Sequence, residues 1–234
     1  MFVLTIVLFV TLALRGGVVL YYFKYYVGRE DLFSIFNVLG TGSTIVGVIL
    51  SKSLALRMGK RDLFIWGLSL TTLFTAAFVF LPPAATAAMI ALEMVRQFAY
   101  GFTIPLLWAM MADVADFSEW HFHRRATAIV FSAIVFGLKA GLGFGGALGG
   151  YVLTLYGYVP NVAQSADALQ GIRLAMSIFP AITFAVCVVC LFFYRIDKKL
   201  EIQIADELTE RRGLYVPVAA ESVMQQAGHA VGSR

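Results

Sequence analysis

The amino-acid sequence predicts an all-α polytopic membrane protein, built as a bundle of six transmembrane helices. Of its 234 residues, 60% are apolar and 14% are charged, whereas soluble domains have about 45–50% apolar and about 25% charged residues. The mean hydropathy is +0.82. Uncharged stretches such as 32–51 and 174–194 are each long enough to cross the roughly 30 Å hydrocarbon core as a helix. This composition excludes a soluble enzyme, a disordered chain and a disulfide-stabilised domain.

Six apolar spans follow one another along the chain, separated by charged residues, by Pro82-Pro83 and by the turn-rich GYVPN of 157–161. The first span continues past Arg15 and has neither a basic start nor a small-residue cleavage site, so we interpret it as a retained helix and not as a signal peptide. Backbone polar groups in lipid must pair internally, which favours helices throughout. The six predicted spans are 2–28, 32–56, 63–81, 85–112, 126–157 and 170–194.

Basic residues predict the orientation of these spans. One set of connectors together with the tail holds 11 of the 18 lysines and arginines, and the opposite connectors hold only Lys24, Arg29 and Arg173. By the positive-inside rule both termini are expected in the cytoplasm, with the chain in the cell's inner (plasma) membrane. The net charge of +4 therefore reflects membrane orientation, and we expect no nucleic-acid partner.

The chain divides into a transmembrane bundle, residues 1–196, and a cytoplasmic tail, residues 197–234. Within the tail, Leu200, Ile204 and Leu208 share one helical face, and Glu207 and Arg211 are four residues apart. This pattern predicts a short amphipathic helix at the cytoplasmic surface. We expect the end of the tail to be disordered.

The sequence indicates neither a catalytic centre nor a metal site. Cys187 and Cys190 form a CxxC in the middle of an apolar span without a second pair, which is typical of small core residues. His121 and His123 have no third ligand at a suitable spacing. We expect no catalytic residue, no metal and no bound cofactor.

Charged residues inside the spans are the candidate functional residues, because a charge at the bilayer centre costs about 2.5–3.5 kcal/mol on insertion scales. Thirteen uncharged residues precede Lys139 and eighteen follow it, so we expect either a lysine that faces a polar cavity or one partner of a buried pair. Arg15, halfway along the first span, is expected to line an aqueous cavity, with or without a ligand contact. Glu93 and Arg96, three apart, predict an ion pair within one helix.

A charged group at the end of the fourth span predicts a gate. Asp113 and Asp116 share a helical face and precede Arg125. Paired carboxylates can do acid–base work, but the nearby arginine favours an ion-pair latch on the cytoplasmic side. The fifth span also carries Gly137, Gly141, Gly145 and Gly149 at intervals of four, which predicts close contact with another helix.

Several stretches resemble one transporter family: LRGGVVLYYFKYYVG, LWAMMADVADFSEWHFHRRATAIVFS, FGLKAGLGFGGALGG and GYVPNVAQSADALQGIR. They are similar to the C-terminal half of the glycoside-pentoside-hexuronide:cation symporters, the melibiose-permease-like branch of the major facilitator superfamily, over residues 1–212. The resemblance implies a bundle equivalent to helices seven to twelve of such a transporter. It also implies sugar uptake coupled to sodium or proton entry by alternating access.

The resemblance also implies roles for particular residues. Lys139 matches a lysine near the sugar and cation sites, and Arg15 and Trp108 are further candidates for substrate binding or coupling. Asp113, Asp116 and Arg125 match the network that closes the cytoplasmic side. Phe117 stands where many relatives have tyrosine. The acidic residues that hold the coupling ion in the family lie mainly on N-terminal helices outside this chain.

Two functional hypotheses follow. In the first, the chain is half or a fragment of a sugar:cation symporter that works with an N-terminal half-transporter chain or with a second copy of itself, on a small sugar or glycoside in the lipid bilayer. In the second, it is a transport-inactive scaffold or regulatory binding protein derived from such a transporter. A transporter cavity lies between two bundles, so one bundle alone leaves its polar face uncovered.

Overall fold

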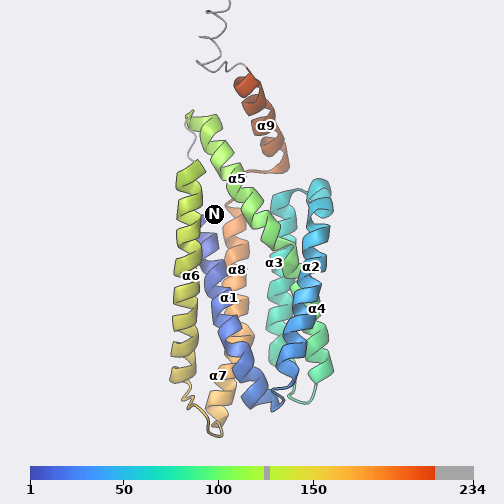
Figure 1. Ribbon diagram of the computed structural model, residues 1–234, viewed down its shortest axis with the longest axis vertical. Coiled ribbons are helices and arrows are strands. Elements are labelled where there is room, and N and C mark those ends of the chain that lie inside the picture. Colours follow the sequence, from blue (N-terminus) through green and yellow to red (C-terminus); the bar gives the residue numbers. More distant parts are fainter. Residues whose placement is uncertain (124–126, 214–234) are drawn as a thin grey trace, which may run out of the picture.

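The computed structural model describes residues 1–123 and 127–213, and the regular structure in these residues is helical (Figure 1). Six helical stretches in this part of the chain are long and apolar enough to cross a membrane. The number and order of the predicted spans are therefore confirmed. In chain order the elements are α1 (Phe2–Tyr21), the π-helix η1 (Tyr22–Val27), α2 (Leu32–Met58), α3 (Lys60–Ala77), the 3-10 helix η2 (Phe78–Phe80), α4 (Thr86–Gly101), α5 (Thr103–Phe122), α6 (Thr127–Leu155), α7 (Ala166–Met176), α8 (Ile178–Phe192) and α9 (Lys198–Gly213).

The fourth and sixth spans are each interrupted near a proline. The helix breaks at Phe102 between α4 and α5, three residues before Pro105, and at Ser177 between α7 and α8, three residues before Pro180. Proline has no N–H to donate to the carbonyl four residues earlier, so the regular ladder fails there. The fourth span also runs on to Phe122 rather than ending at 112, because α5 continues beyond its apolar part and packs against α9.

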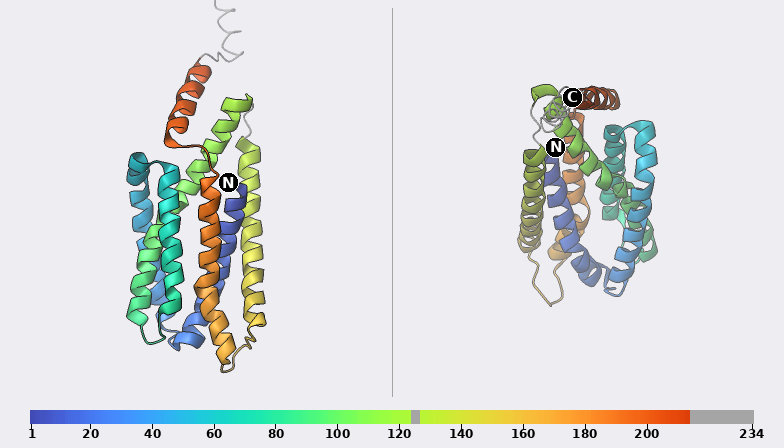
Figure 2. Two further views of the ribbon diagram at one scale, coloured as in Figure 1. Left: turned by 180° about the vertical axis from the view of Figure 1, so that it is seen from behind. Right: turned by 45° about the horizontal axis from the view of Figure 1, so that its top comes forward.

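The helices form two groups that meet along α3 and α8. In one group α1 packs between α6 and α8, and in the other α4 packs against α2 and α3 (Figures 1 and 2). Met1 and α9 lie at the same end of the bundle, together with the connector between α2 and α3 (Figure 1). The buried core is aromatic and aliphatic, with Phe64, Met110 and Phe184 in one cluster and Tyr22 and Phe36 in the other.

Glycines permit the closest helix contacts, as the spacing in the fifth span predicts. A Cβ added at Gly141 of α6 would lie 2.7 Å from the Ile6 carbonyl oxygen and 2.8 Å from the Phe9 Cβ on α1. Gly47 of α2 and Gly101 of α4 face each other in the same way, and a Cβ on either would overlap backbone of the opposite helix. Both helix pairs approach at backbone distance because these positions carry no side chain.

Two helices are left largely uncovered. In their most apolar 18-residue windows only 17% of α2 and 22% of α6 is buried, compared with 44% for the span formed by α1 and η1. Each of the two helices packs against the bundle along one narrow face, so α2 and α6 lie on the flanks of this bundle (Figure 1). Their exposed faces are available to lipid or to a second protein surface.

Candidate functional site

Lys139 lies in the middle part of α6, on the face that points away from α1. Its side chain is exposed and borders a shallow, open depression with Ser132, Val135 and Phe136. In the part of the chain that the structure describes, no carboxylate pairs with Lys139. Of the two alternatives for this lysine, the buried structural pair is therefore not found within the described residues, and the ammonium is directed outward from the bundle.

Arg15, by contrast, points into the bundle and completes a buried triad. Its Nη2 lies 2.7 Å from Oε2 of Glu93, and its Nη1 lies 3.3 Å from Oε1. Arg96 donates to the same carboxylate at 2.6 and 2.9 Å, which confirms the predicted pair within α4. The three residues are only 6%, 2% and 3% exposed, so Arg15 joins α1 to α4 and does not line an open cavity in this conformation.

The triad carries one net positive charge, because two guanidinium groups share one carboxylate. The guanidinium carbon of Arg15 lies 5.3 Å from the centre of the Phe78 ring, where the negative face of the aromatic ring partly balances this charge. Arg15 Nε is buried and has no hydrogen-bond partner among the described residues. The triad is therefore a strongly coupled but incompletely satisfied polar group inside the bundle.

Trp108 stands on the outer face of α5 and is 40% exposed. It shares no hydrogen bond or ring contact with Lys139 or Arg15 among the described residues, so the three candidates for substrate binding do not converge within this bundle. Phe117, at the position of the expected tyrosine, stacks against the His121 ring with centroids 5.7 Å apart. Phe117 therefore makes an aromatic contact where a tyrosine would also offer a hydroxyl.

The predicted gate residue Asp113 is paired with a lysine that the sequence analysis did not single out. Lys60 Nζ, at the start of α3, lies 2.7 and 2.8 Å from the two carboxylate oxygens of Asp113. The same ammonium lies 3.0 Å from Oε1 of Glu201 on α9. Asp116 is half-buried one turn further along α5. Arg125, the expected partner, lies outside the described residues.

Helix α9 covers this end of the bundle. Ile204 and Leu208 of its apolar face are each 3% exposed, and α9 packs against α5. Trp120 Nε1 donates to Oε2 of Glu207 at 2.6 Å, and the predicted pair of Glu207 with Arg211 is present at 3.7 Å. Residues Lys198–Gly213 thus form a helix, and Ile204 and Leu208 on it contact protein.

Hydrogen bonding lowers the pKa of the Glu207 carboxyl group, because Gln203 and Trp120 both donate to it.

Cys187 and Cys190 are free thiols within α8. In the chain as described, no group of three or more His, Cys, Asp or Glu residues gathers in a way that could hold a metal ion.

Six apolar spans, a buried charged triad and an ion-pair cluster at one end define a polytopic membrane protein of the transporter class. Residues 1–198 match the family model for MFS/sugar transport proteins, and the chain belongs to this family. It is 32% identical over 212 residues to the putative glycoside/cation symporter YagG of Escherichia coli (strain K12), covering 88% of this chain and 46% of that protein.

Two other relatives are named for different substrates. The isoprimeverose transporter of Lactiplantibacillus pentosus is 34% identical over 190 residues, covering 79% of this chain and 38% of the relative. The putative 2,3-dihydroxypropane-1-sulfonate exporter of Escherichia coli (strain K12) is 28% identical over 193 residues, covering 82% and 42%. The chain spans somewhat less than half the length of these curated relatives.

Proposed function

We propose that this chain forms one half of a secondary active sugar:cation symporter that works by alternating access. The observation that carries the proposal is the exposed Lys139 in the middle of α6, a helix whose most apolar window is only 22% buried. An ammonium in the bilayer interior needs water or a partner. A second bundle placed over α2 and α6 would supply both, by enclosing a polar cavity at mid-membrane.

The second bundle in this proposal is an N-terminal half-transporter chain or a second copy of this chain. The coverage of 38–46% of the relatives supports a partner of similar size. The substrate is a small sugar or glycoside, as the names of YagG and the isoprimeverose transporter suggest. The coupling ion is Na⁺ or H⁺, held mainly by the N-terminal half, and this chain contributes no bound cofactor.

The same proposal places the assembly in the inner membrane with both termini in the cytoplasm. The end of the bundle that carries Met1 and α9 also carries Arg57, Lys60 and Arg61, which favours this orientation by the positive-inside rule. Asp113 and Lys60 would then belong to a cytoplasmic gate. Lys139, Arg15 and Trp108 are the candidates for substrate binding or coupling, each at a separate place in this bundle.

Reconstitution tests this function directly. Proteoliposomes contain either the chain alone or the chain with the N-terminal half of a full-length relative. Radiolabelled isoprimeverose is added outside the vesicles under an inward Na⁺ or proton gradient. We expect accumulation only when both halves are present. Accumulation by the chain alone would assign the second bundle to another copy. Binding of the sugar without accumulation in either preparation would favour the transport-inactive scaffold.

A further inference from the structure

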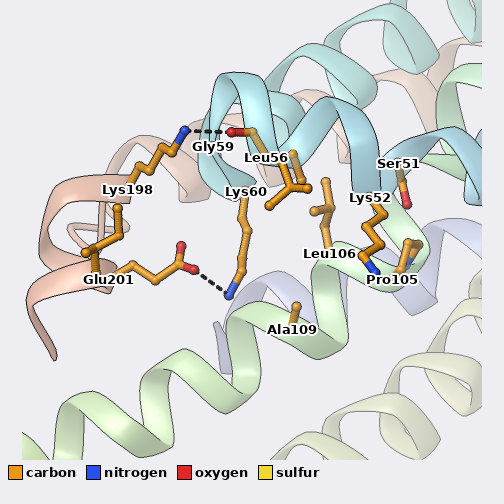
Figure 3. A pocket seen from close by; sticks show the side chains of 12 residues that line it. Ser51, Lys52, Leu56, Gly59, Lys60, Pro105, Leu106, Ala109, Lys198 and Glu201 are labelled. Atoms are coloured by element: carbon orange, nitrogen blue, oxygen red, sulfur yellow. Dashed lines mark hydrogen bonds and ion pairs between the residues drawn. The ribbon is translucent and has the colours of Figure 1, made fainter. Parts of the chain in front are cut away.

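A cavity of about 470 Å³ lies where α9 meets the ends of α2, α3 and α5. Figure 3 shows that three lysines from three different helices border it: Lys52 of α2, Lys60 of α3 and Lys198 of α9. One carboxylate, that of Glu201, faces the same space. The cavity is separate from the triad of α1 and α4 and from Lys139 on α6, so it belongs to neither part of the proposed substrate site.

The three ammoniums differ in how far they are satisfied. Lys60 pairs with both Asp113 and Glu201, so these three side chains together carry one net negative charge. Lys198 donates to the backbone carbonyl of Leu56 at 2.6 Å, which uses one of its three N–H groups and none of its charge. Lys52 has no ion-pair partner within the residues that the structure describes. The three lysines and the two carboxylates together carry one net positive charge, and Lys52 and Lys198 are the two lysines without an ion-pair partner among the described residues.

The rest of the cavity wall is apolar. Leu56, Leu106, Ala109 and Ile202 form most of it, and Pro105 adds a ring. This combination occurs at the basic end of the bundle, where α2 ends at Met58 and α3 begins at Lys60. Basic groups above an apolar wall, at the level of the membrane boundary, match a molecule with an anionic head and a hydrocarbon tail.

We propose that this cavity binds an anionic phospholipid. The phosphodiester accepts hydrogen bonds from Lys52 and Lys198, and an acyl chain lies along Leu106, Ala109 and Ile202. Because Lys198 and Ile202 belong to α9, the lipid connects α9 to the bundle. A zwitterionic lipid fits less well, since its own ammonium brings a positive charge to a site that already has two unneutralised lysines.

Native mass spectrometry of the purified full chain in detergent tests the site, with dioleoylphosphatidylglycerol and dioleoylphosphatidylcholine titrated separately. We expect the phosphatidylglycerol to bind more tightly to the wild-type chain. Lys52→Gln and Lys198→Gln should each weaken its binding by about fivefold. The matched control is Lys199→Gln, on the exposed neighbour of Lys198, and should bind as wild type. Equal binding of the two lipids, or unchanged phosphatidylglycerol binding in the Lys52→Gln, Lys198→Gln double variant, would overturn the proposal.

Two further arms separate the lipid from other occupants. Glycerol 3-phosphate at the same concentration should not displace the lipid, because it lacks the chain that contacts the apolar wall. If it does displace the lipid, the site is one for free phosphate esters. In liposomes containing phosphatidylglycerol, Lys52 should be protected from an amine-reactive reagent. Protection that instead requires a co-reconstituted N-terminal half, whatever the lipid, would assign the cavity to protein and contradict the proposal.

Discussion

Arg15 and Glu93 are 78 residues apart in the sequence, yet their side chains make two hydrogen bonds inside the bundle, at 2.7 and 3.3 Å. Arg96 holds the other side of the same carboxylate. The contact between Arg15 of α1 and Arg96 of α4 therefore depends on one acidic side chain, which both buried guanidiniums share.

Glu93→Gln should destabilise the bundle by about 3–5 kcal/mol, because it leaves two buried arginines without a counter-charge. The free energy of unfolding of the purified chain in mixed micelles measures this effect. Asp31→Asn is the matched control, since Asp31 pairs with Arg29 at an exposed position, where solvent screens the pair and its loss should change the stability little. Equal effects of the two substitutions would show that the triad adds little to stability.

Lys139→Leu should leave membrane insertion intact and remove gradient-driven uptake in the assembled transporter. The substitution abolishes the cost of a mid-membrane ammonium, so the amount of inserted protein should stay the same or rise. Insertion is followed by the yield of folded protein, and uptake by radiolabelled sugar. Lys24→Gln, at an exposed position in η1, is the control and should retain uptake. Wild-type uptake by the leucine variant would exclude a coupling role for Lys139.

Asp113→Asn should shift the assembled transporter towards the conformation that is open at the basic end, because Lys60 loses two charge-assisted hydrogen bonds. A single cysteine at Ser132, on the exposed side of α6, reports the shift by its labelling rate from that end. Asp62→Asn changes an exposed carboxylate at the start of α3 and should leave labelling unaltered. Identical labelling of the Asp113 variant and the wild type would count against a gate at this pair.

Gly141→Ala should destabilise the chain by about 1–3 kcal/mol, because its new methyl group would overlap the α1 backbone at Ile6. Gly143→Ala is two residues away on the same helix and meets nothing within 4 Å. It should be neutral or stabilise by up to about 1 kcal/mol through better helix propensity. Thermal unfolding of both variants separates the contact from the propensity, and an equal loss in both would show that α6 as a whole, and not its contact with α1, is sensitive.

Acidification should loosen α9. The pKa of the Glu207 carboxyl group is lowered in the folded chain by hydrogen bonds from Gln203 and Trp120, so its contribution to docking is present above the ordinary glutamate pKa. That contribution is lost as the pH falls through the lowered value. Hydrogen exchange of the amides of α9 as a function of pH measures the effect. Glu207→Gln should remove the pH dependence, and a retained dependence would assign it to another group.

Structure that depends on neighbouring residues in the sequence was predicted better than contacts between residues on different helices. The six spans depend on length and hydropathy, and the pair of Glu93 with Arg96 depends on a spacing of three, so both were predicted correctly. The partners of Arg15 and Asp113 lie on other helices, and sequence spacing contains no information about which helices become neighbours. In the sequence, Lys60 is only one of several basic residues between the second and third spans, because its pairing depends on how α3, α5 and α9 pack together.

The interruption at Phe102 divides the fourth span into two helices, α4 and α5, that are held by different contacts. The upper contacts of α5 include Lys60 and α9, whereas α4 is held by the triad and by the glycine contact with α2. Because Pro105 cannot donate to the Gly101 carbonyl, bending at this joint costs fewer hydrogen bonds than bending elsewhere in the span. We therefore expect a change in the ion pairs of Asp113 to tilt α5 about this joint while α2 and α4 stay packed together.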